Sequence, residues 1–513
     1  MFDDINLKLA DLLFPDVSST IDDLEKKYPP RNLPDGAFVT RLAPSPTGFI
    51  HLGNLFGALI DERLAHQSNG IFYLRIEDTD QKRKVDGAIE LIISSLARFG
   101  FKFDEGYSLS NGKYGPYIQS ERKALYKEYA EKLVELGGAY YCFCTPERIA
   151  SLKDDEGNVR YDKHCLKLTK EEIKSKIDAG EPYVIRQNVP LTGTGTYHDL
   201  VYGDIAVDYK DIEDGILLKS DGMPTYNFAN VIDDHLMGIT HVIRGIEYLS
   251  STPKYNLMYD AFGWERPTYI HLPPIMKDSQ HKLSKRNGDA SYEDFVNKGY
   301  VKESIINYIA LLGWSPKSNT EKMSLSELVE NFSLDGISKS PSIFDEVKMK
   351  WLSGEYIKEM SDEEFKLNAE KFLKESKAYG KYDEDKLLKL IRTRIQIFSE
   401  IPEKLNFLEE FEKYDLSLFN NEKQKSSIET AKEVLPKIKE TLSNITTFEN
   451  STLFSELVNL SASLGIKKQA LLWIARIAIT GKEATAGGAT EIAEILGKEE
   501  TLRRIDFSLN LLK

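Results

Sequence analysis

Residues 38–80 carry the sequence FVTRLAPSPTGFIHLGNLFGALIDERLAHQSNGIFYLRIEDTD, which predicts a strand, a turn, a helix and a second strand in succession. The first strand, 38–43, is short and rich in apolar and β-branched residues. The run at 44–48 ends it, because its two prolines cannot donate to a strand ladder and its glycine tolerates a turn. Apolar residues at helical spacing follow. His51 and Gly53 therefore lie at a helix N-terminus, where free N–H groups suit a phosphate.

The second predicted strand ends in a polar cluster. This strand spans 71–76, and Glu77, Asp78, Thr79 and Asp80 come directly after it. In open α/β sheets, ligands bind beyond the carboxyl ends of the strands. Both polar clusters lie at such strand ends, so the segment predicts one half of a nucleotide-binding fold.

These residues resemble the first motif of the class I aminoacyl-tRNA synthetases. Residues 41–54, Arg-Leu-Ala-Pro-Ser-Pro-Thr-Gly-Phe-Ile-His-Leu-Gly-Asn, are similar to the form found in bacterial glutamyl-tRNA synthetases, and residues 75–80 resemble the strand end that follows it. Asn54 stands where the motif can have a second histidine. The alternative, an ordinary βαβ unit with a solvent-exposed His51, would leave the combined match to chance.

Residues 282–286, Lys-Leu-Ser-Lys-Arg, resemble the second motif of the same family. Charge builds on the phosphate oxygens when ATP is attacked at its α-phosphate, and Lys282 and Lys285 on a mobile loop could close on them. A basic loop taken alone would more often be a solvated surface. The resemblance implies four catalytic residues, His51, Gly53, Lys282 and Lys285. It also implies an ATP site of His51, Gly53, Asn54, Glu247, Lys282, Leu283, Ser284, Lys285 and Arg286.

Residues 225–247 resemble the amino-acid pocket of the family. Glutamate has two carboxylates and one ammonium, so a selective site needs cations, an acid and neutral donors. Arg41 and Arg244 offer planar guanidinium groups, and Glu77 can pair with the ammonium. Either arginine taken alone would more often form an ordinary surface pair. The glutamate site that the resemblance implies consists of Arg41, Leu42, Ala43, Ser45, Glu77, Tyr226, Asn227, Phe228, Ala229, Asn230 and Arg244.

The same stretch contains Asp233, Asp234, His235 and His241, which are residue types that bind metals. The family has no established metal site at these positions. Such side chains commonly cap helices or bond to the backbone. We therefore expect structural roles for these four residues.

Cys142, Cys144 and Cys165 form a candidate zinc site. They lie within residues 119–214, which the resemblance assigns to an inserted domain that holds the tRNA acceptor end. Zinc needs about four ligands, mostly thiolates or imidazoles, and a Cys-x-Cys turn can supply two. The fourth ligand would be Tyr161 or His164. The zinc-binding form of the family has a histidine two residues after the last cysteine, where this chain has lysine. A former zinc module held together by packing is the alternative.

The composition is that of a globular protein with several domains. The chain has 513 residues, 41% of them hydrophobic and 29% charged, which is enough for three or four domains. No apolar run approaches the ~18 residues that span a bilayer, and the N-terminus lacks a signal-peptide pattern. Three cysteines are too few for a disulfide framework. We therefore expect a cytoplasmic protein without a membrane partner.

The formal net charge of −14 argues against a nucleic-acid partner only if the cations are evenly spread. Residues 461–482 contain four cations, Lys467, Lys468, Arg476 and Lys482, and no acidic residue. This segment predicts a local basic face. A solvated helix face explains the same pattern equally well.

The expected fold class is α/β. The resemblance implies a Rossmann-like class I catalytic domain that carries an inserted acceptor-binding domain, followed by an all-α anticodon-binding domain. Helices are predicted at 304–313, 326–331, 361–374, 385–398, 427–442 and 464–479. The expected boundaries are an N-terminal extension at 1–36, the catalytic domain at 37–118 and 215–290, the inserted domain at 119–214, a stem-contact domain at 291–335 and the anticodon-binding domain at 336–513.

The resemblance implies a ligase that uses ATP and Mg²⁺ to convert L-glutamate to glutamyl-adenylate and transfers it to the 3′-terminal adenosine of tRNA(Glu), with tRNA bound before activation. It also implies a monomer. Charging of tRNA(Gln) stays open. Three alternatives stay open. The first is a glutaminyl-tRNA synthetase, which the Pro-Ser-Pro-Thr-Gly turn and the helical C-terminal half disfavour. The others are a truncated relative that modifies a tRNA base and a non-catalytic tRNA-binding protein.

Overall fold

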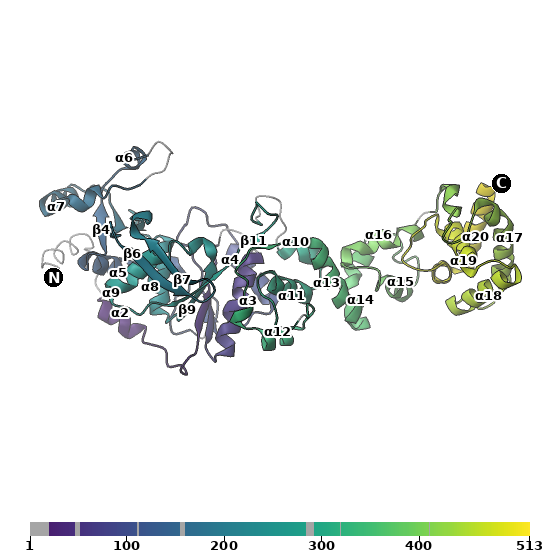
Figure 1. The fold of residues 1–513 in the computed structure, drawn as a ribbon, viewed down its shortest axis with the longest axis horizontal. Helices are drawn as coiled ribbons and strands as arrows, with labels where there is room; N and C mark the ends of the chain where they lie inside the picture. The colour runs from purple at the N-terminus through teal and green to yellow at the C-terminus, as the bar shows by residue number, and fades with distance from the viewer. Residues whose placement is uncertain are drawn as a thin grey trace. The chain divides into compact units, whose positions relative to one another are not determined.

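The computed structural model describes residues 20–46, 52–109, 112–153, 160–283, 292–318, 320–409 and 411–513. The chain folds into two compact units (Figure 1). The first comprises Met1–Glu293 and Ile306–Phe344, and the second comprises Asp294–Ile305 and Asp345–Lys513. The first contains sheets and helices. The described residues of the second form helices without a β-strand, as the α/β and all-α expectations require.

The strand, helix and strand predicted at 38–80 are present. β1 (Val39–Leu42) and β2 (Ile71–Leu74) pair in parallel, with Val39 opposite Ile71, and α3 (Leu52–Gln67) connects them. β3 (Glu105–Gly106) continues this sheet beside β2. α4 (Ala88–Phe99) ends at Gly100, which adopts a left-handed conformation (φ 83°) that glycine tolerates best.

A second sheet lies beside the first. Its strand order is β7 (Gly203–Asp208), β6 (Thr194–Asp199), β10 (Thr268–Leu272) and β9 (His241–Gly245), and β10 runs parallel to both of its neighbours. The two sheets meet along β1 and β9, where the Thr240 N–H donates to the Val39 carbonyl at 3.1 Å. The carboxyl ends of β1, β2 and β9 consequently open toward one region of the first unit.

Residues 123–262 also contain a third, antiparallel sheet, whose strands lie before and after β6 and β7 in sequence. The sheet order is β4 (Ala139–Cys142), β5 (Val184–Gln187) and β8 (Ile216–Leu218). Its side chains join an aromatic core that includes Tyr126, Tyr129 and Phe228. The helices of this part are α5 (Lys123–Glu135), α6 (Pro146–Ala150), α7 (Lys170–Asp178), α8 (Tyr226–Leu236) and α9 (Thr252–Phe262). Further along lie α10 (Tyr292–Asn297), α11 (Lys302–Gly313), α12 (Leu325–Asn331), β11 (Ile275–Met276) and β12 (Ser342–Ile343).

The described part of the N-terminal extension packs against the first unit. α2 (Ile21–Lys27) begins with a capping box between Thr20 and Asp23. Arg31 then forms a bidentate pair with Glu105 at 2.8 and 3.0 Å and donates from Nε to the Met237 carbonyl at 2.6 Å. These contacts hold the described part of the extension against the first unit.

The second unit is a helical array around one apolar core. The core is built from aliphatic and aromatic side chains such as Leu435, Ile474 and Ile505, which are fully buried. None of the described helices has the length and apolar character needed to cross a membrane. The helices are α13 (Glu346–Glu359), α14 (Asp362–Leu373), α15 (Glu384–Ile391), α16 (Ile401–Leu405), α17 (Ile428–Asn444), α18 (Asn450–Ser463), α19 (Lys468–Thr480) and α20 (Ala489–Leu512).

The helix predicted at 385–398 is too long. α15 ends at Ile391, where the Arg394 N–H donates to the Ile391 carbonyl at 2.7 Å and closes a tight turn. The side chains of Ile395, Ile397 and Phe398, which follow this turn, are buried although α15 does not extend to them. Hydrophobic spacing alone does not distinguish the two arrangements.

Candidate active site

A polar cleft of about 1250 Å³ lies at the carboxyl ends of β1 and β9 and at the N-terminus of α3. Most of the described residues that the sequence assigns to glutamate or ATP line this cleft. They are Arg41, Leu42, Ala43, Ser45, Gly53, Asn54, Glu77, Tyr226, Arg244, Glu247, Lys282 and Leu283. The fold therefore gathers side chains from widely separated parts of the sequence into one site.

Four described residues of the expected glutamate set do not line the cleft: Asn227, Phe228, Ala229 and Asn230. Phe228 and Ala229 are fully buried in the aromatic core. Asn230 donates to the Tyr226 carbonyl one helical turn earlier, at 2.8 Å. Because α8 turns about 100° per residue, only one of its faces can point into the cleft.

Four other residues of the expected site, His51, Ser284, Lys285 and Arg286, lie outside the described residues. The structure therefore supports the first and second sequence motifs through their neighbours Gly53, Asn54, Lys282 and Leu283, which all line the cleft.

Arg41 and Arg75 share the carboxylate of Asp234 beneath the cleft. Asp234 accepts from Arg41 Nε at 3.0 Å and from Nη2 at 3.1 Å, and Arg75 Nη1 lies 2.8 Å from Asp234 Oδ1. Arg75 Nη2 donates to Glu77 Oε1 at 2.8 Å. The Nη1 of Arg41 lies 3.5 Å from the Ile243 carbonyl. Most of the hydrogen-bonding capacity of Arg41 is thus already used inside the protein.

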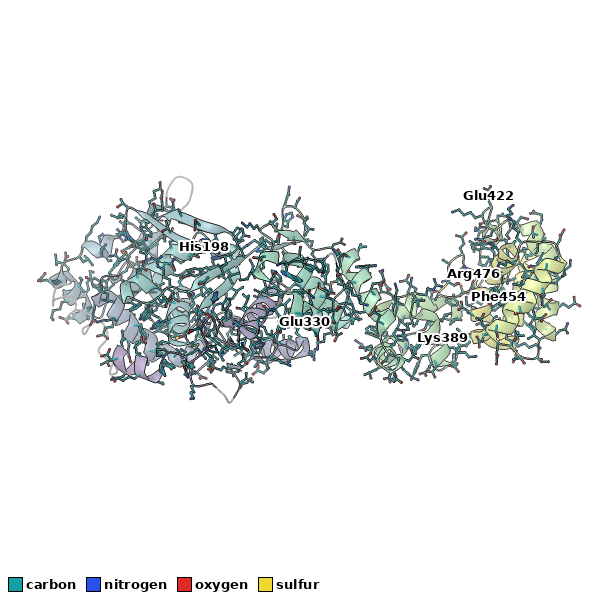
Figure 2. All side chains as sticks on the ribbon, turned by 60° about the horizontal axis from the view of Figure 1, so that its bottom comes forward. His198, Glu330, Lys389, Glu422, Phe454 and Arg476 are labelled. Atoms are coloured by element: carbon teal, nitrogen blue, oxygen red, sulfur yellow. The ribbon has the colours of Figure 1, made fainter. Side chains whose placement is uncertain are left out.

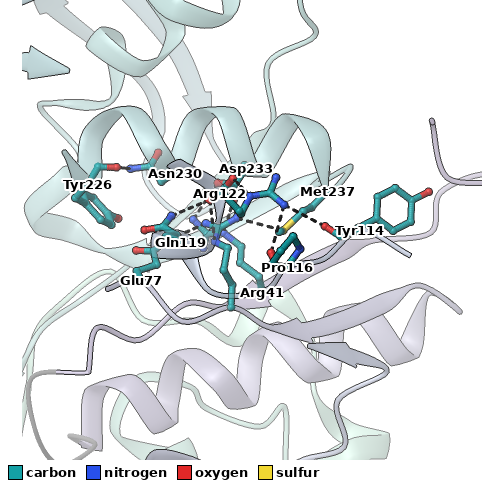
Figure 3. Close-up of polar contacts among 12 residues, drawn as sticks. Arg41, Glu77, Tyr114, Pro116, Gln119, Arg122, Tyr226, Asn230, Asp233 and Met237 are labelled. Carbon is teal, nitrogen blue, oxygen red and sulfur yellow. Dashed lines mark hydrogen bonds and ion pairs between the residues drawn. The ribbon is translucent and has the colours of Figure 1, made fainter. Parts of the chain in front are cut away.

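Asp233, the neighbour of Asp234 on α8, holds a second group of side chains (Figure 3). Its Oδ1 accepts from Arg122 Nε at 2.7 Å, and its Oδ2 accepts from Gln119 Nε2 at 2.9 Å and Tyr126 Oη at 2.8 Å. Every one of these side chains is buried. The two aspartates together make α8 the element that fixes the arginines below the cleft.

The two histidines of the same stretch pack against aromatic rings. His235 stacks on Trp264 with ring centroids 3.6 Å apart, and His241 stacks on Phe38 at the same distance. Burial lowers the pKa of His241 to about 4. Asp233, Asp234, His235 and His241 therefore have ion-pairing and packing partners, in keeping with the structural roles expected for them.

The buried network shifts the protonation of its carboxyl groups in two directions. Burial opposes the charged form of Asp234, but Arg41 and Arg75 outweigh it and lower the pKa of this carboxyl. Burial dominates at Glu77, whose pKa is raised although Arg75 and Arg41 oppose the shift. Burial also raises the pKa of Asp61, another residue of the cleft, well above its ordinary value. An incoming ammonium would favour the ionised form of Glu77.

Arg244 on β9 differs from Arg41 because no carboxylate of the described residues forms an ion pair with it. Its Nε donates to His271 Nε2 at 3.2 Å and its Nη2 donates to Thr252 Oγ1 at 2.6 Å. The rings of Tyr248, Tyr255 and Tyr269 lie 5.2, 4.7 and 5.2 Å from its guanidinium carbon. A partly buried cation without a charge partner is costly, so the arrangement indicates an anionic ligand.

The N-terminus of α3 presents Gly53 to the cleft. A Cβ atom at Gly53 would meet no described atom within 4 Å. Packing within the described residues therefore does not require glycine here. Helix N-termini bind phosphate through free N–H groups, and a glycine leaves this backbone open to a ligand.

Lys282 and Glu247 face each other across the mouth of the cleft, with Lys282 Nζ 3.9 Å from Glu247 Oε2. Both side chains are more than half exposed, at 57% and 54%. An exposed pair at this distance contributes little to stability. Lys282 is consequently available for an anion that enters the cleft.

The three cysteines form a compact cluster with Tyr161. Their Sγ atoms all lie within 4.8 Å of one another. Tyr161 Oη lies 3.3 Å from Cys142 Sγ and 3.5 Å from Cys144 Sγ, and Cys144 Sγ lies 3.5 Å from Cys165 Sγ. Tetrahedral zinc with bonds of about 2.3 Å separates its sulfur ligands by about 3.8 Å. The three thiols and the phenol therefore fit the edges of a zinc tetrahedron.

Cys142 is the group of the cluster that ionises most readily. Hydrogen bonds from Cys165, Tyr161 and Arg186 lower the pKa of the Cys142 thiol to about 4 against the opposing effect of burial, whereas the hydrogen bond with Cys142 raises the pKa of Cys165 and burial raises the pKa of Tyr161. The Arg186 guanidinium lies 4.3 Å from the centre of the Tyr161 ring. Thiolates are the form that binds zinc, and a nearby guanidinium balances their charge.

The helical unit has a cavity of its own, of about 520 Å³, lined in part by Phe454, Trp473, Arg476 and Glu491. Figure 2 labels Phe454 and Arg476 in this unit. Arg476 belongs to the basic segment at 461–482, in which Lys467, Lys468 and Lys482 are exposed. Aromatic and guanidinium groups side by side suit an unstacked base.

Several residues of the site escape sequence patterns. Asp234, Arg75, Thr252 and His271 contact the cleft arginines or support them. Arg75 and Asp234 lie in stretches that resemble the family, Thr252 and His271 lie outside them, and no pattern assigns any of the four to an arginine. The sequence feature that could predict the ion pairs of Asp234 is an acidic residue among apolar residues of a helix. Such an acid is buried and needs a cationic partner.

Two family models match consecutive parts of the chain. Residues 37–351 match the catalytic domain of the class I tRNA synthetases for glutamate and glutamine (E and Q), and residues 347–509 match an anticodon-binding domain. Together with the parallel sheet and the cleft at its strand ends, these matches define a class I aminoacyl-tRNA synthetase.

Relatives and solved structures narrow the class. The chain is 53% identical over 487 residues to the glutamate–tRNA ligase of Clostridium kluyveri, and the match covers 92% of this chain and 98% of the relative. It is 50% identical over 478 residues to the glutamate–tRNA ligase of Clostridium acetobutylicum, with the same coverage of both chains. A glutamate tRNA ligase from Elizabethkingia meningosepticum, solved with its amino acid, superposes with a TM-score of 0.83 at 33% identity, covering 93% of this chain and 100% of that one. The chain belongs to the glutamyl-tRNA synthetase family.

Proposed function

We propose that the cleft of the first unit binds L-glutamate and ATP and joins them before the glutamyl group passes to tRNA. The chain is a ligase that attaches glutamate to tRNA(Glu) at the expense of ATP. The observation that carries the assignment of the site is Arg244, which lines the cleft and forms no ion pair with a carboxylate of the described residues.

Glutamate would bind with one carboxylate on Arg244. Within the described residues the Nη1 atom of Arg244 makes no hydrogen bond, and its Nη2 donates only to the Thr252 hydroxyl. Burial and the nearby Glu77 keep the Tyr226 phenol protonated by raising its pKa, so it can donate to a carboxylate. Glu77 would accept the ammonium. Arg41, already held by Asp234, would contribute its positive potential and its Nη1 group.

ATP would lie between the N-terminus of α3 and the segment around Lys282. Gly53 and Asn54 border one side of the cleft, and Glu247, Lys282 and Leu283 border the other. His51, Ser284, Lys285 and Arg286 keep the ATP-binding roles proposed for them from the sequence motifs. The Mg²⁺ that accompanies ATP would offset phosphate charge.

Catalysis in this arrangement rests on positioning. The glutamate carboxylate attacks the α-phosphate of ATP in line, which gives glutamyl-adenylate and pyrophosphate. The 2′-hydroxyl of the terminal adenosine of tRNA then takes the glutamyl group and releases AMP. The attacking groups belong to the substrates, so the residues of the cleft act by orientation and electrostatic stabilisation.

The helical unit would hold the tRNA anticodon region. Its cavity combines Trp473, Phe454 and Arg476, groups on which bases stack. The exposed Lys467, Lys468 and Lys482 add cations for the phosphate backbone. Activity as a monomer in the cytoplasm is part of the same proposal.

The experiment that tests the function is charging of purified tRNA(Glu) and tRNA(Gln) with labelled glutamate in the presence of ATP. We expect glutamate on tRNA(Glu). Label on tRNA(Gln) as well would identify an enzyme that accepts both tRNAs. Binding of tRNA without any charging by the folded protein would contradict the proposal and favour a non-catalytic tRNA-binding protein.

We also propose that zinc occupies the cysteine cluster, with Tyr161 as its fourth ligand. The phenol oxygen lies against two of the sulfurs. The other candidate, His164, is exposed, and its backbone N–H donates to Asp162. Zinc there would have a structural role, because four protein ligands leave no open position.

Metal analysis of purified protein is expected to find one zinc per chain. Cys165→Ser should abolish retention of zinc, and Tyr161→Phe should weaken it so that a mild chelator removes the metal faster. His164→Ala is the matched control and should retain zinc like the wild type. Loss of zinc in His164→Ala with retention in Tyr161→Phe would reverse the assignment of the fourth ligand, and zinc-free wild type would refute the site.

A further inference from the structure

Three neighbouring parallel strands place a connected set of polar side chains behind Arg244. Arg244 on β9 is the register partner of His271 on β10, and Asp199 at the end of β6 is the register partner of Tyr269, two residues before His271. Asp199 and His271 are fully buried. Neither lines the cleft, so both act on a ligand only through Arg244.

The contacts determine the tautomer of His271. Arg244 Nε can only donate a hydrogen bond, so His271 Nε2, at 3.2 Å, must be its acceptor and carry no proton. The proton of the neutral ring is then on Nδ1, which lies 2.6 Å from Asp199 Oδ2. The ring therefore transmits the orientation of Asp199 to the guanidinium.

Asp199 is itself held rigidly by backbone groups. Its Oδ1 accepts from the N–H groups of Val201 at 2.9 Å and Tyr202 at 2.8 Å, and its Oδ2 accepts from the His271 N–H at 3.1 Å. Burial opposes its charged form, but the hydrogen bonds from His271 and Tyr202 outweigh it and lower the pKa of this carboxyl. The anionic end of the set is thus fixed to the main chain.

We propose that Asp199 and His271 are positioning residues that hold the guanidinium of Arg244 in the orientation that receives a glutamate carboxylate. The inference rests on the proposed glutamate site and deepens it. His271 fixes Nε and Thr252 fixes Nη2, so the remaining N–H groups of the guanidinium are directed by two protein contacts before the substrate arrives.

The proposal requires a neutral imidazole. The charged and titratable groups around it are Asp199 on β6, Arg244 on β9 and Glu247 in the turn Ile246–Tyr248, with the rings of Tyr197 and Tyr269 also near. Burial lowers the pKa of His271, and Arg244 lowers it further, against Asp199 and Glu247. Protonation of Nε2 would remove the acceptor of Arg244 and place a second cation beside it.

The test compares His271→Leu and His271→Gln with the wild type in steady-state charging of tRNA(Glu). His271→Leu removes the acceptor, and we expect KM for glutamate to rise about 10- to 30-fold while KM for ATP stays within about twofold. His271→Gln keeps a carbonyl oxygen for Arg244, so we expect its KM to lie closer to wild type. His198→Ala, an exposed histidine on the same β6 strand as Asp199 (Figure 2), is the control and should leave both KM values unchanged.

A pH profile separates positioning from packing. The wild type should lose affinity for glutamate as pH falls through the pKa of His271, which burial holds below the ordinary histidine value of about 6.5, because protonated His271 no longer accepts from Arg244. His271→Gln has no ionisable group at this position, so this part of the profile should disappear. A folded His271→Leu with wild-type KM for glutamate, or the same acid loss in His271→Gln, would overturn the proposal. An Arg244→Ala enzyme with normal KM for glutamate would instead refute the glutamate site itself.

Discussion

Replacing Arg244 by alanine is expected to lower kcat/KM for glutamate by about two to three orders of magnitude. The guanidinium has no acidic partner among the described residues, so the substrate carboxylate would be the charge that it pairs with. Removing one partner of a desolvated, hydrogen-bonded charge pair costs about 2–5 kcal/mol, much of it from the charge that is left unpaired. The measurement is steady-state charging of tRNA(Glu) over a range of glutamate concentrations.

Two further variants show whether charge or geometry carries the effect. Arg244→Lys retains the cation but loses the planar guanidinium, so we expect an intermediate loss. Arg266→Ala serves as the control, because Arg266 pairs with Asp260 and does not line the cleft. A comparable loss in Arg266→Ala, or an unchanged kcat/KM in Arg244→Ala, would contradict the role assigned to Arg244.

Local patterns predict the elements that position the site. Strand propensity, the Pro-containing turn and helical spacing indicate β1, α3 and β2, and Gly100 marks the end of α4 at its observed residue. These features depend on interactions within a few residues of sequence, which the sequence displays directly. The arrangement of Arg41 and Glu77 at neighbouring strand ends follows from the parallel pairing of β1 and β2.

Long-range pairing is what the sequence does not display. Asp234 meets Arg41 across 193 residues of sequence, and His271 meets Asp199 across 72. No periodicity marks such partners, because each side chain occupies one position in its own strand or helix. A continuous motif also does not show which of its side chains point into a site. The motif at 225–247 therefore predicts Phe228 and Ala229 beside Tyr226 in the glutamate site, whereas their side chains lie in the core.

The fourth ligand at the cysteine cluster illustrates a third limit. Sequence spacing allows Tyr161 or His164, which are three residues apart. The proposed zinc site uses Tyr161, because Tyr161 is buried with its hydroxyl against the thiols while His164 is exposed. Such a choice depends on the conformation of a short loop rather than on residue type.

Replacing Asp234 by alanine is expected to lower the free energy of unfolding of the first unit by about 3–5 kcal/mol. This carboxylate is buried and serves both Arg41 and Arg75, so its removal leaves two buried cations without their main partner. Arg41 would also lose the contacts on its Nε and Nη2, and glutamate binding should weaken with it. Hydrogen exchange of α8, compared with α19 in the helical unit, measures the loss in the first unit alone.

The pH dependence of this effect has a defined sign. The pKa of Asp234 is lowered in the folded protein because Arg41 and Arg75 outweigh burial. Its stabilising contribution is therefore present above the unfolded pKa of about 3.9 and is lost as pH falls through the lower, folded pKa. The difference in free energy of unfolding between wild type and Asp234→Ala should be largest near neutral pH and should decrease below about pH 4. Asp204→Ala, at an exposed carboxylate of the β6–β7 hairpin, should match wild type at every pH. Among the described residues, Asp234 is the carboxylate that forms an ion pair with Arg41. Equal stability of Asp234→Ala and Asp204→Ala at neutral pH would therefore show that Asp234 does not hold the two arginines.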